Sequence, residues 1–166
     1  YDAVYEHVET AMNDFAAATG RQYKPFEFYG HPQAERVIVI MGSAIGTCEE
    51  VVDELLSRGE KVGVLKVRLY RPFSAAHLLQ ALPESARAVA VLDRTKEPGA
   101  LAEPLYLDVM TALAEAFNRG ERETLPRTIG GRYGLSSKEF GPECVLAIFN
   151  ELQAAQPKPR FTVGIY

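Results

Sequence analysis

Three short, nearly continuous apolar runs constrain the fold of this chain more than any other feature. They span Val37–Met41, Val62–Val67 and Ala88–Leu92, and stretches with helical periodicity separate them. A strand that is apolar on both faces is typical of a parallel sheet with helices on both sides. Strands that alternate with helices predict βαβ units. The sequence therefore predicts an α/β domain built on a mostly parallel sheet.

Weaker patterns predict the remaining elements. Phe26–Tyr29 alternates over a few residues and predicts a short edge strand, and the glycine-rich run 126–134 predicts a last strand. Thr47 followed by Glu50 has the spacing of a capping box, which predicts that Thr47 is the N-cap of a helix. The other expected helices, each bounded by a capping, proline or glycine signal, cover residues 4–20, 74–82, 105–120 and 142–152.

Composition and charge exclude several classes of function. The chain has 166 residues, of which 47% are apolar and 24% charged, and its net charge is −4. These values are ordinary for a globular protein, and the dispersed basic residues give no nucleic-acid footprint. No run reaches the length of a membrane span, and no signal-peptide pattern opens the sequence. We therefore expect neither a nucleic-acid nor a membrane partner.

The two cysteines, Cys48 and Cys144, stand alone in the sequence. Their spacing predicts no metal or cluster site, and such isolated thiols favour a reducing, cytoplasmic setting. Cys144 lies on the apolar side of the last expected helix, so we expect it to be buried and unreactive.

The two ends of the chain suggest a piece of a longer polypeptide. Position 1 is Tyr, and Phe161–Tyr166 resembles a strand that is cut in mid-course. We therefore expect residues 1–24 to form a helix and connector from a preceding domain. Residues 25–156 would form the α/β domain, and residues 157–166 a linker and the start of the next domain.

Four basic residues lie where the expected strands end. Arg68 and Arg71 follow the second apolar run, and Arg94 and Lys96 follow the third. Ligands bind at the carboxyl ends of the strands in doubly wound sheets, so these side chains could hold a phosphate or a carboxylate. They could equally contact a neighbouring domain, since exposed loops often carry function at such junctions. We favour the interface interpretation.

No complete active site is visible in the sequence. The turn Gly42–Gly46 follows a strand and precedes a helix, but it is not a P-loop, and the acidic residues that follow it would repel phosphate. The histidines His7, His31 and His77 have no Ser, Cys or carboxylate partner at a telling spacing. We therefore predict no catalytic, metal-binding or cofactor-binding residue.

Five ordered blocks of sequence carry a resemblance to a known family. They are Ala34–Ser43, Glu60–Phe73, Val91–Gly99, Pro104–Val109 and Gly131–Phe140, and Phe161–Ile165 also fits as the point where the family's next domain begins. Together they closely resemble the second domain of pyruvate:ferredoxin (flavodoxin) oxidoreductase, over nearly the whole chain.

The resemblance implies a fold similar to the carboxyl-terminal domain of transketolase. That fold is a three-layer α/β/α sandwich with a mixed, mostly parallel five-stranded sheet and one antiparallel edge strand, for which Phe26–Tyr29 is the natural candidate. The family's enzyme converts pyruvate and coenzyme A to acetyl-CoA and CO2. It uses thiamine diphosphate with magnesium and [4Fe-4S] clusters, and it passes electrons to ferredoxin or flavodoxin.

The residues that such cofactors require are missing from this sequence. No Gly-Asp-Gly motif is present for thiamine diphosphate, and two isolated cysteines cannot hold a four-iron cluster. We therefore expect a noncatalytic structural domain, inactive alone, in a parent enzyme that is a homodimer. One alternative is a contribution to coenzyme A binding through Arg94 and Lys96. Another is the same domain in a related redox protein, such as a sulfite reductase subunit.

Overall fold

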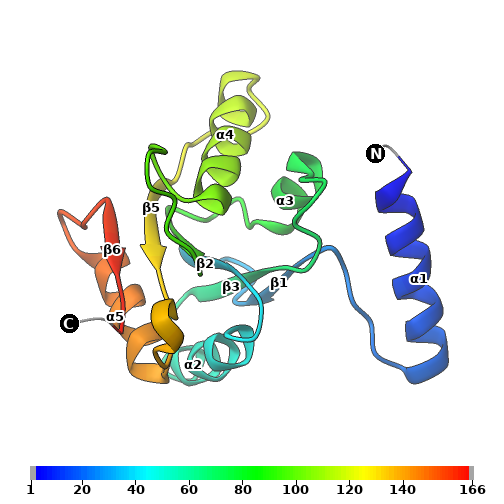
Figure 1. Cartoon of the computed structure of the whole chain (residues 1–166), viewed down its shortest axis with the longest axis horizontal. Coiled ribbons are helices and arrows are strands. Elements are labelled where there is room, and N and C mark those ends of the chain that lie inside the picture. The colour runs from blue at the N-terminus through cyan, green and yellow to red at the C-terminus, as the bar shows by residue number, and fades with distance from the viewer. Residues whose placement is uncertain (1–2, 165–166) are drawn as a thin grey trace.

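A computed structural model describes residues 3–164 of the chain. It contains one six-stranded sheet in the order β1-β3-β2-β4-β5-β6 (Figure 1). Only β1 runs antiparallel to its neighbour, β3. The strands are β1 Phe26–Gly30, β2 Arg36–Met41, β3 Val62–Val67, β4 Ala88–Asp93, β5 Arg127–Arg132 and β6 Arg160–Thr162. The predicted α/β class and the antiparallel edge strand are therefore confirmed.

Helices cover both faces of the sheet, which gives the predicted three layers. The helices α2 and α5 pack on one face and α3 and α4 on the other. Every residue of β3 and β4 is buried, which explains why their sequences read as apolar runs. The helices are α1 Val4–Thr19, α2 Ile45–Ser57, α3 Ala75–Ala81, α4 Pro104–Asn118 and α5 Pro142–Gln153, with a 3-10 turn η1 at Leu135–Ser137.

The prediction of five strands was one strand short. The sixth strand, β6, lies within the segment 157–166 that was expected to begin a following domain, and it pairs in parallel with β5. Gly131 makes room for the Phe161 ring of β6, because a Cβ at that position would overlap this ring. The sequence indicated a strand at Phe161–Tyr166, but a local pattern cannot show which sheet a strand joins.

The predicted capping box at Thr47 was wrong. The helix α2 begins two residues earlier, at Ile45, and its N-cap is Ala44, which makes no side-chain capping bond. The chain turns at Gly42, and the N–H of Ile45 donates to the Gly42 carbonyl at 3.3 Å, so the helical turn is already closed before Thr47. In contrast, the predicted cap of α3 is confirmed, since Ser74 Oγ accepts from the N–H of His77 at 3.3 Å.

The helix α1 stands to one side of the sandwich and buries none of its residues (Figure 1). Its clearest contact with the domain is a stack of the Tyr5 ring on His77, with the ring centroids 4.5 Å apart. At its other end Phe15 lies against Tyr23 of the connector. None of the described helices combines the length and apolarity needed to cross a membrane.

Candidate interface at the carboxyl edge of the sheet

The parallel strands β2, β3, β4 and β5 end at the same edge of the sheet, as the sequence predicted. The four basic residues of the prediction all lie in loops at this edge. However, Arg68, Arg71 and Arg94 are bonded to different groups of residues, and within residues 3–164 no hydrogen bond or ion pair joins any two of the four. The structure therefore does not bring them together into one anion site.

Arg68 belongs to a partly buried ionic cluster between β1, β3 and α2. Its guanidinium forms an ion pair with Glu27 and lies over the ring of Tyr23, 4.8 Å from the centroid. Glu27 also pairs with Lys66, which in turn contacts Glu49 of α2 at 2.8 Å. Lys66 is only 4% exposed. Because Arg68 is already neutralised by a carboxylate, its role is to hold this corner of the sheet.

Lys66 was not identified from the sequence as the centre of the ionic cluster, although the sequence contains a signal for it. It is the one charged residue in the otherwise apolar run Val62–Val67. A lysine is almost never fully buried unless it is paired, so its position predicts a carboxylate partner on a neighbouring element. The partner cannot be identified from the sequence, because Glu27 and Glu49 are far from Lys66 along the chain.

The ionic cluster makes a prediction about pH. Burial alone would raise the pKa of Glu27, but the hydrogen bonds and charges of Lys66 and Arg68 outweigh burial and lower this pKa from its ordinary value of 4.5. A lowered folded-state pKa contributes stability that is present above the unfolded pKa and is lost as the pH falls through the folded one. We therefore expect the free energy of unfolding to fall less at acidic pH in the variant Glu27→Gln than in the unmodified chain.

The measurement is the free energy of unfolding in urea at several pH values from neutral down to below 4.5. The chain with Glu27→Gln should lose less stability over this interval than the unmodified chain. Glu54→Gln is the matched control, because Glu54 forms an exposed pair with Arg58 on α2. Equal pH slopes for Glu27→Gln and the unmodified chain would show that the cluster does not stabilise the ionised carboxylate.

Arg71 connects the loop after β3 to α4. It forms an ion pair with Asp108 at 2.7 Å, and its guanidinium stacks on the ring of Tyr70, 3.8 Å from the centroid. The Tyr70 hydroxyl donates to the same carboxylate at 3.0 Å. Burial, and after it the hydrogen bond to Asp108, raises the pKa of Tyr70 to about 12. Like Arg68, Arg71 therefore already has a carboxylate partner inside the domain.

Arg94 and Lys96 lie on a loop with a different character. All residues from 94 to 101 are exposed, and Leu101 has an exposed fraction of 95%. Arg94 donates through Nε to the Gly134 carbonyl at 3.3 Å, and no carboxylate pairs with Arg94 or Lys96 among residues 3–164. This loop presents two unneutralised cations and a large apolar side chain to its surroundings.

Two buried carboxylates hold the base of this loop. Asp93, at the end of β4, accepts hydrogen bonds from the N–H groups of Leu105 and Tyr106 at 2.9 and 3.2 Å, and so caps α4. Burial raises the pKa of Asp93, although the two backbone N–H donors partly oppose this shift. On the other side of the loop Glu103 is 2% exposed and pairs with Arg132 of β5. The loop is therefore exposed but fixed at both ends.

The remaining polar groups do not fit the cofactors that the resemblance implies. Burial raises the pKa of Cys48 to about 12 and also raises the pKa of Cys144, so both remain protonated thiols. Cluster ligation requires grouped thiolates. Among residues 3–164 no group of three or more His, Cys, Asp or Glu side chains could hold a metal ion.

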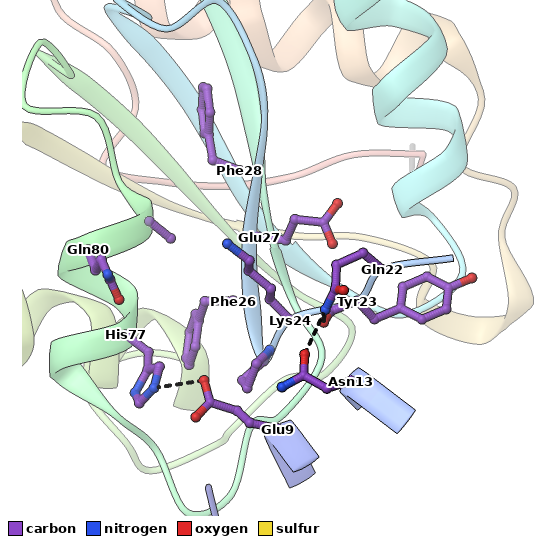
Figure 2. A pocket seen from close by; sticks show the side chains of 12 residues that line it. Glu9, Asn13, Gln22, Tyr23, Lys24, Phe26, Glu27, Phe28, His77 and Gln80 are labelled. Carbon is purple, nitrogen blue, oxygen red and sulfur yellow. Dashed lines mark hydrogen bonds and ion pairs between the residues drawn. The ribbon is translucent and has the colours of Figure 1, made fainter. Parts of the chain in front are cut away.

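A cleft lies beside the edge strand β1, between this strand, α1 and α3, and it begins where β1 pairs with the carboxyl end of β3. Its volume is about 780 Å³ (Figure 2). His77 of α3 reaches Glu9 of α1 across one end, with 3.4 Å between Nε2 and Oε1. At the other end of the cleft, the side-chain amide of Gln22 donates a hydrogen bond to the side chain of Asn13. The cleft exposes part of the unpaired side of β1.

Comparisons with known proteins agree on one family. A family model described as pyruvate:ferredoxin oxidoreductase core domain II matches residues 34–135. A probable pyruvate-flavodoxin oxidoreductase of Escherichia coli (strain K12) is 87% identical over 166 residues, which are 100% of this chain and 14% of that protein. The pyruvate-flavodoxin oxidoreductase of Rhodospirillum rubrum is 60% identical over 99% of this chain and 14% of that protein.

Two further matches extend this comparison. The pyruvate:ferredoxin oxidoreductase of Moorella thermoacetica is 55% identical over 95% of this chain and 13% of that protein. A solved 2-oxoglutarate:ferredoxin oxidoreductase from Magnetococcus marinus matches with a TM-score of 0.49 and 22% identity, over 89% of this chain and 23% of that chain. The chain thus spans only 13–14% of the length of these three curated relatives.

Proposed function

Because the chain belongs to the family of pyruvate:ferredoxin oxidoreductase core domain II, we propose that it is a noncatalytic structural domain of such an oxidoreductase. The whole enzyme would convert pyruvate and coenzyme A to acetyl-CoA and CO2 in the cytoplasm and reduce ferredoxin or flavodoxin. Thiamine diphosphate with magnesium and [4Fe-4S] clusters would supply the chemistry. We place these cofactors in other parts of the polypeptide, and we expect the complete enzyme to be a homodimer.

The loop 94–101 is the observation that supports this role. Its base is fixed by Asp93 and Glu103, while Leu101 and the two cations of Arg94 and Lys96 face outward. A fixed loop that presents an apolar side chain beside unneutralised charge suits a contact with another folded domain. We propose that this loop contacts the catalytic part of the enzyme, and that Arg68 and Arg71 support it from within the domain.

This proposal predicts the effect of a triple substitution in the full-length enzyme. Arg94→Ala, Lys96→Ala and Leu101→Ser together should reduce pyruvate-dependent flavodoxin reduction by about tenfold or more, as the loss of an interface anchor does. The matched control is Arg58→Ala, Lys61→Ala and Leu125→Ser. It removes the same charge and one partly exposed leucine from the amino-terminal side of the sheet.

The readouts are the rate of flavodoxin reduction and the oligomeric state. The 166-residue chain with the loop substitutions should melt within a few degrees of the unmodified chain, because the three side chains are exposed. Full activity and unchanged assembly of the loop variant would refute the interface role of this loop.

A contribution to coenzyme A binding is the second candidate function. The lack of a carboxylate partner for Arg94 and Lys96 within residues 3–164 favours it, since such cations bind phosphate groups readily. Calorimetric titration of the chain with coenzyme A, with magnesium thiamine diphosphate as the comparison, tests it. Saturable heat with coenzyme A alone, abolished by Arg94→Ala and Lys96→Ala, is the expected result for this candidate. The absence of heat would refute it.

A further inference from the structure

The hydrogen-bond pattern of β1 shows which of its backbone groups lack a partner. The N–H of Arg68 donates to the Pro25 carbonyl at 2.8 Å, and the N–H of His31 donates to the Val62 carbonyl at 2.9 Å. These two bonds flank β1 in the register of its antiparallel pairing with β3. Bonded and non-bonded pairs alternate along such a ladder. The N–H and C=O groups of Phe28 therefore point away from β3, toward the free edge.

Within residues 3–164 no group is hydrogen bonded to these outward groups of Phe28. The side chain of Phe28 is half-buried, and that of Phe26 is only 4% exposed. Backbone groups that face outward from an edge strand without a protein partner form a template for pairing with another extended chain. The edge can therefore accept a backbone partner.

A proline or an unpaired charge often blocks such pairing at a natural edge strand. The strand β1 contains no proline, and its one charged side chain, Glu27, is turned toward Lys66 and Arg68 and neutralised by them. Instead, the edge lines the cleft between α1 and α3, as Figure 2 shows. Two aromatic side chains of β1, Phe26 and Phe28, line this cleft on the side that faces α3.

The size and setting of the cleft indicate what occupies it. A volume of about 780 Å³ accommodates a few extended residues. The helix α1 forms one wall of the cleft through Glu9 and Asn13, which leaves less room for the sheet of a second copy of the chain than for a single extended segment (Figure 2). The curated relatives are about seven times longer than this chain, so most of the parent polypeptide lies outside these residues. Because a segment of the same polypeptide is tethered to this domain, its effective concentration at the cleft is higher than that of a separate molecule.

We propose that an extended segment of the parent polypeptide, from outside residues 1–166, pairs with the free edge of β1 as a further strand of the sheet. Its backbone satisfies the outward groups of Phe28, and an apolar side chain of the segment packs beside the two phenylalanines. This inference rests on the proposed role as one domain of a larger enzyme, but it uses a different surface from the loop 94–101.

Amide hydrogen exchange tests this pairing residue by residue. We compare the 166-residue chain, whose helices cover both faces of its own sheet, with the full-length enzyme. The amide of Phe28 should exchange about a hundredfold more slowly in the full-length enzyme. The amides of Glu27 and Tyr29, which face β3, should be protected in both. Equal exchange of Phe28 in the two proteins would refute the proposal.

Substitution of Phe28 locates the partner segment. Phe28→Pro removes the outward N–H together with the ring and leaves the N–H groups that face β3 in place, while Phe28→Ala removes the ring but keeps this N–H. The difference between the two variants therefore reports the N–H alone. In the full-length enzyme with Phe28→Pro, one segment outside residues 1–166 should take up deuterium faster than in the unmodified enzyme. With Phe28→Ala, the increase in uptake by the same segment should be smaller. If both variants give the same uptake as the unmodified enzyme, no strand is added at this edge.

Two other outcomes remain distinguishable. Protection of Phe28 that depends on the concentration of the 166-residue chain would mean that a second copy binds the edge, and would overturn the proposal. The triple substitution of the loop 94–101 should leave the exchange of Phe28 unchanged, so a failure of the proposed interface function and a failure of this inference give different results.

Discussion

Replacing Lys66 by alanine is expected to lower the free energy of unfolding by about 2–3 kcal/mol, somewhat less than the cost for a fully buried ion pair, because the carboxylates of Glu27 and Glu49 remain partly exposed to water. Lys66 is 4% exposed and contacts the carboxylates of Glu27 and Glu49. Without it, two negative charges face each other across a partly buried space, with only Arg68 left as a cation. Urea unfolding of the 166-residue chain at neutral pH measures the loss.

Two controls separate the charge from other effects. Lys61→Ala removes an exposed lysine that pairs loosely with Glu35 at 3.5 Å, and it should cost less than about 1 kcal/mol. Lys66→Met keeps the length of the side chain but removes the charge, so it should retain most of the destabilisation. A loss below about 1 kcal/mol for Lys66→Ala would contradict the role of the ionic cluster in holding β1, β3 and α2 together.

Gly30→Ala is expected to have a comparably large effect, of about 3 kcal/mol, from backbone strain and overpacking together. Gly30 has a φ of +140°, which L-residues rarely adopt. A Cβ at this position would lie 2.5 Å from both the Cα of Gly63 and the carbonyl oxygen of Val62. Because both atoms belong to the backbone of the paired region, the clash can be relieved only by separating β1 from β3.

Gly20→Ala is the matched control for this prediction. Gly20 also has a positive φ, of +74°, but a Cβ there would meet nothing within 4 Å. It therefore isolates the cost of the strained conformation, which is about 1 kcal/mol. Thermal and urea unfolding of both variants measure the difference. Equal destabilisation by the two substitutions would show that the close contact with β3 is not what requires glycine at position 30.

Most of the fold could be predicted because its central strands are buried on both faces. The runs at β2, β3 and β4 have no polar alternation, and in a chain with helices between the runs this pattern is typical of parallel strands covered on both sides. The errors lie where local signals do not decide the structure. A strand at Phe161 was expected but was assigned to a following domain, because its pairing with β5 joins segments far apart in sequence. The start of α2 depends on a turn at Gly42 rather than on the side chain of Thr47.

The candidate site could be predicted only in its position along the strands. The carboxyl edge follows from the parallel order, so the location of Arg68, Arg71, Arg94 and Lys96 was expected. Their partners depend on contacts between residues far apart in sequence, such as Arg71 with Asp108. Only the structure shows that two of the four are neutralised within the domain and that the loop carrying the other two exposes Leu101.

The most direct test of the interface is the accessibility of position 101. Leu101→Cys should be tolerated, because the side chain is 95% exposed, and the native Cys48 and Cys144 are buried. We would measure the alkylation rate of this cysteine by mass spectrometry in the 166-residue chain and in the full-length enzyme. The account predicts a rate at least about tenfold lower in the full-length enzyme, because the loop is covered there. Equal rates in the two proteins would contradict it.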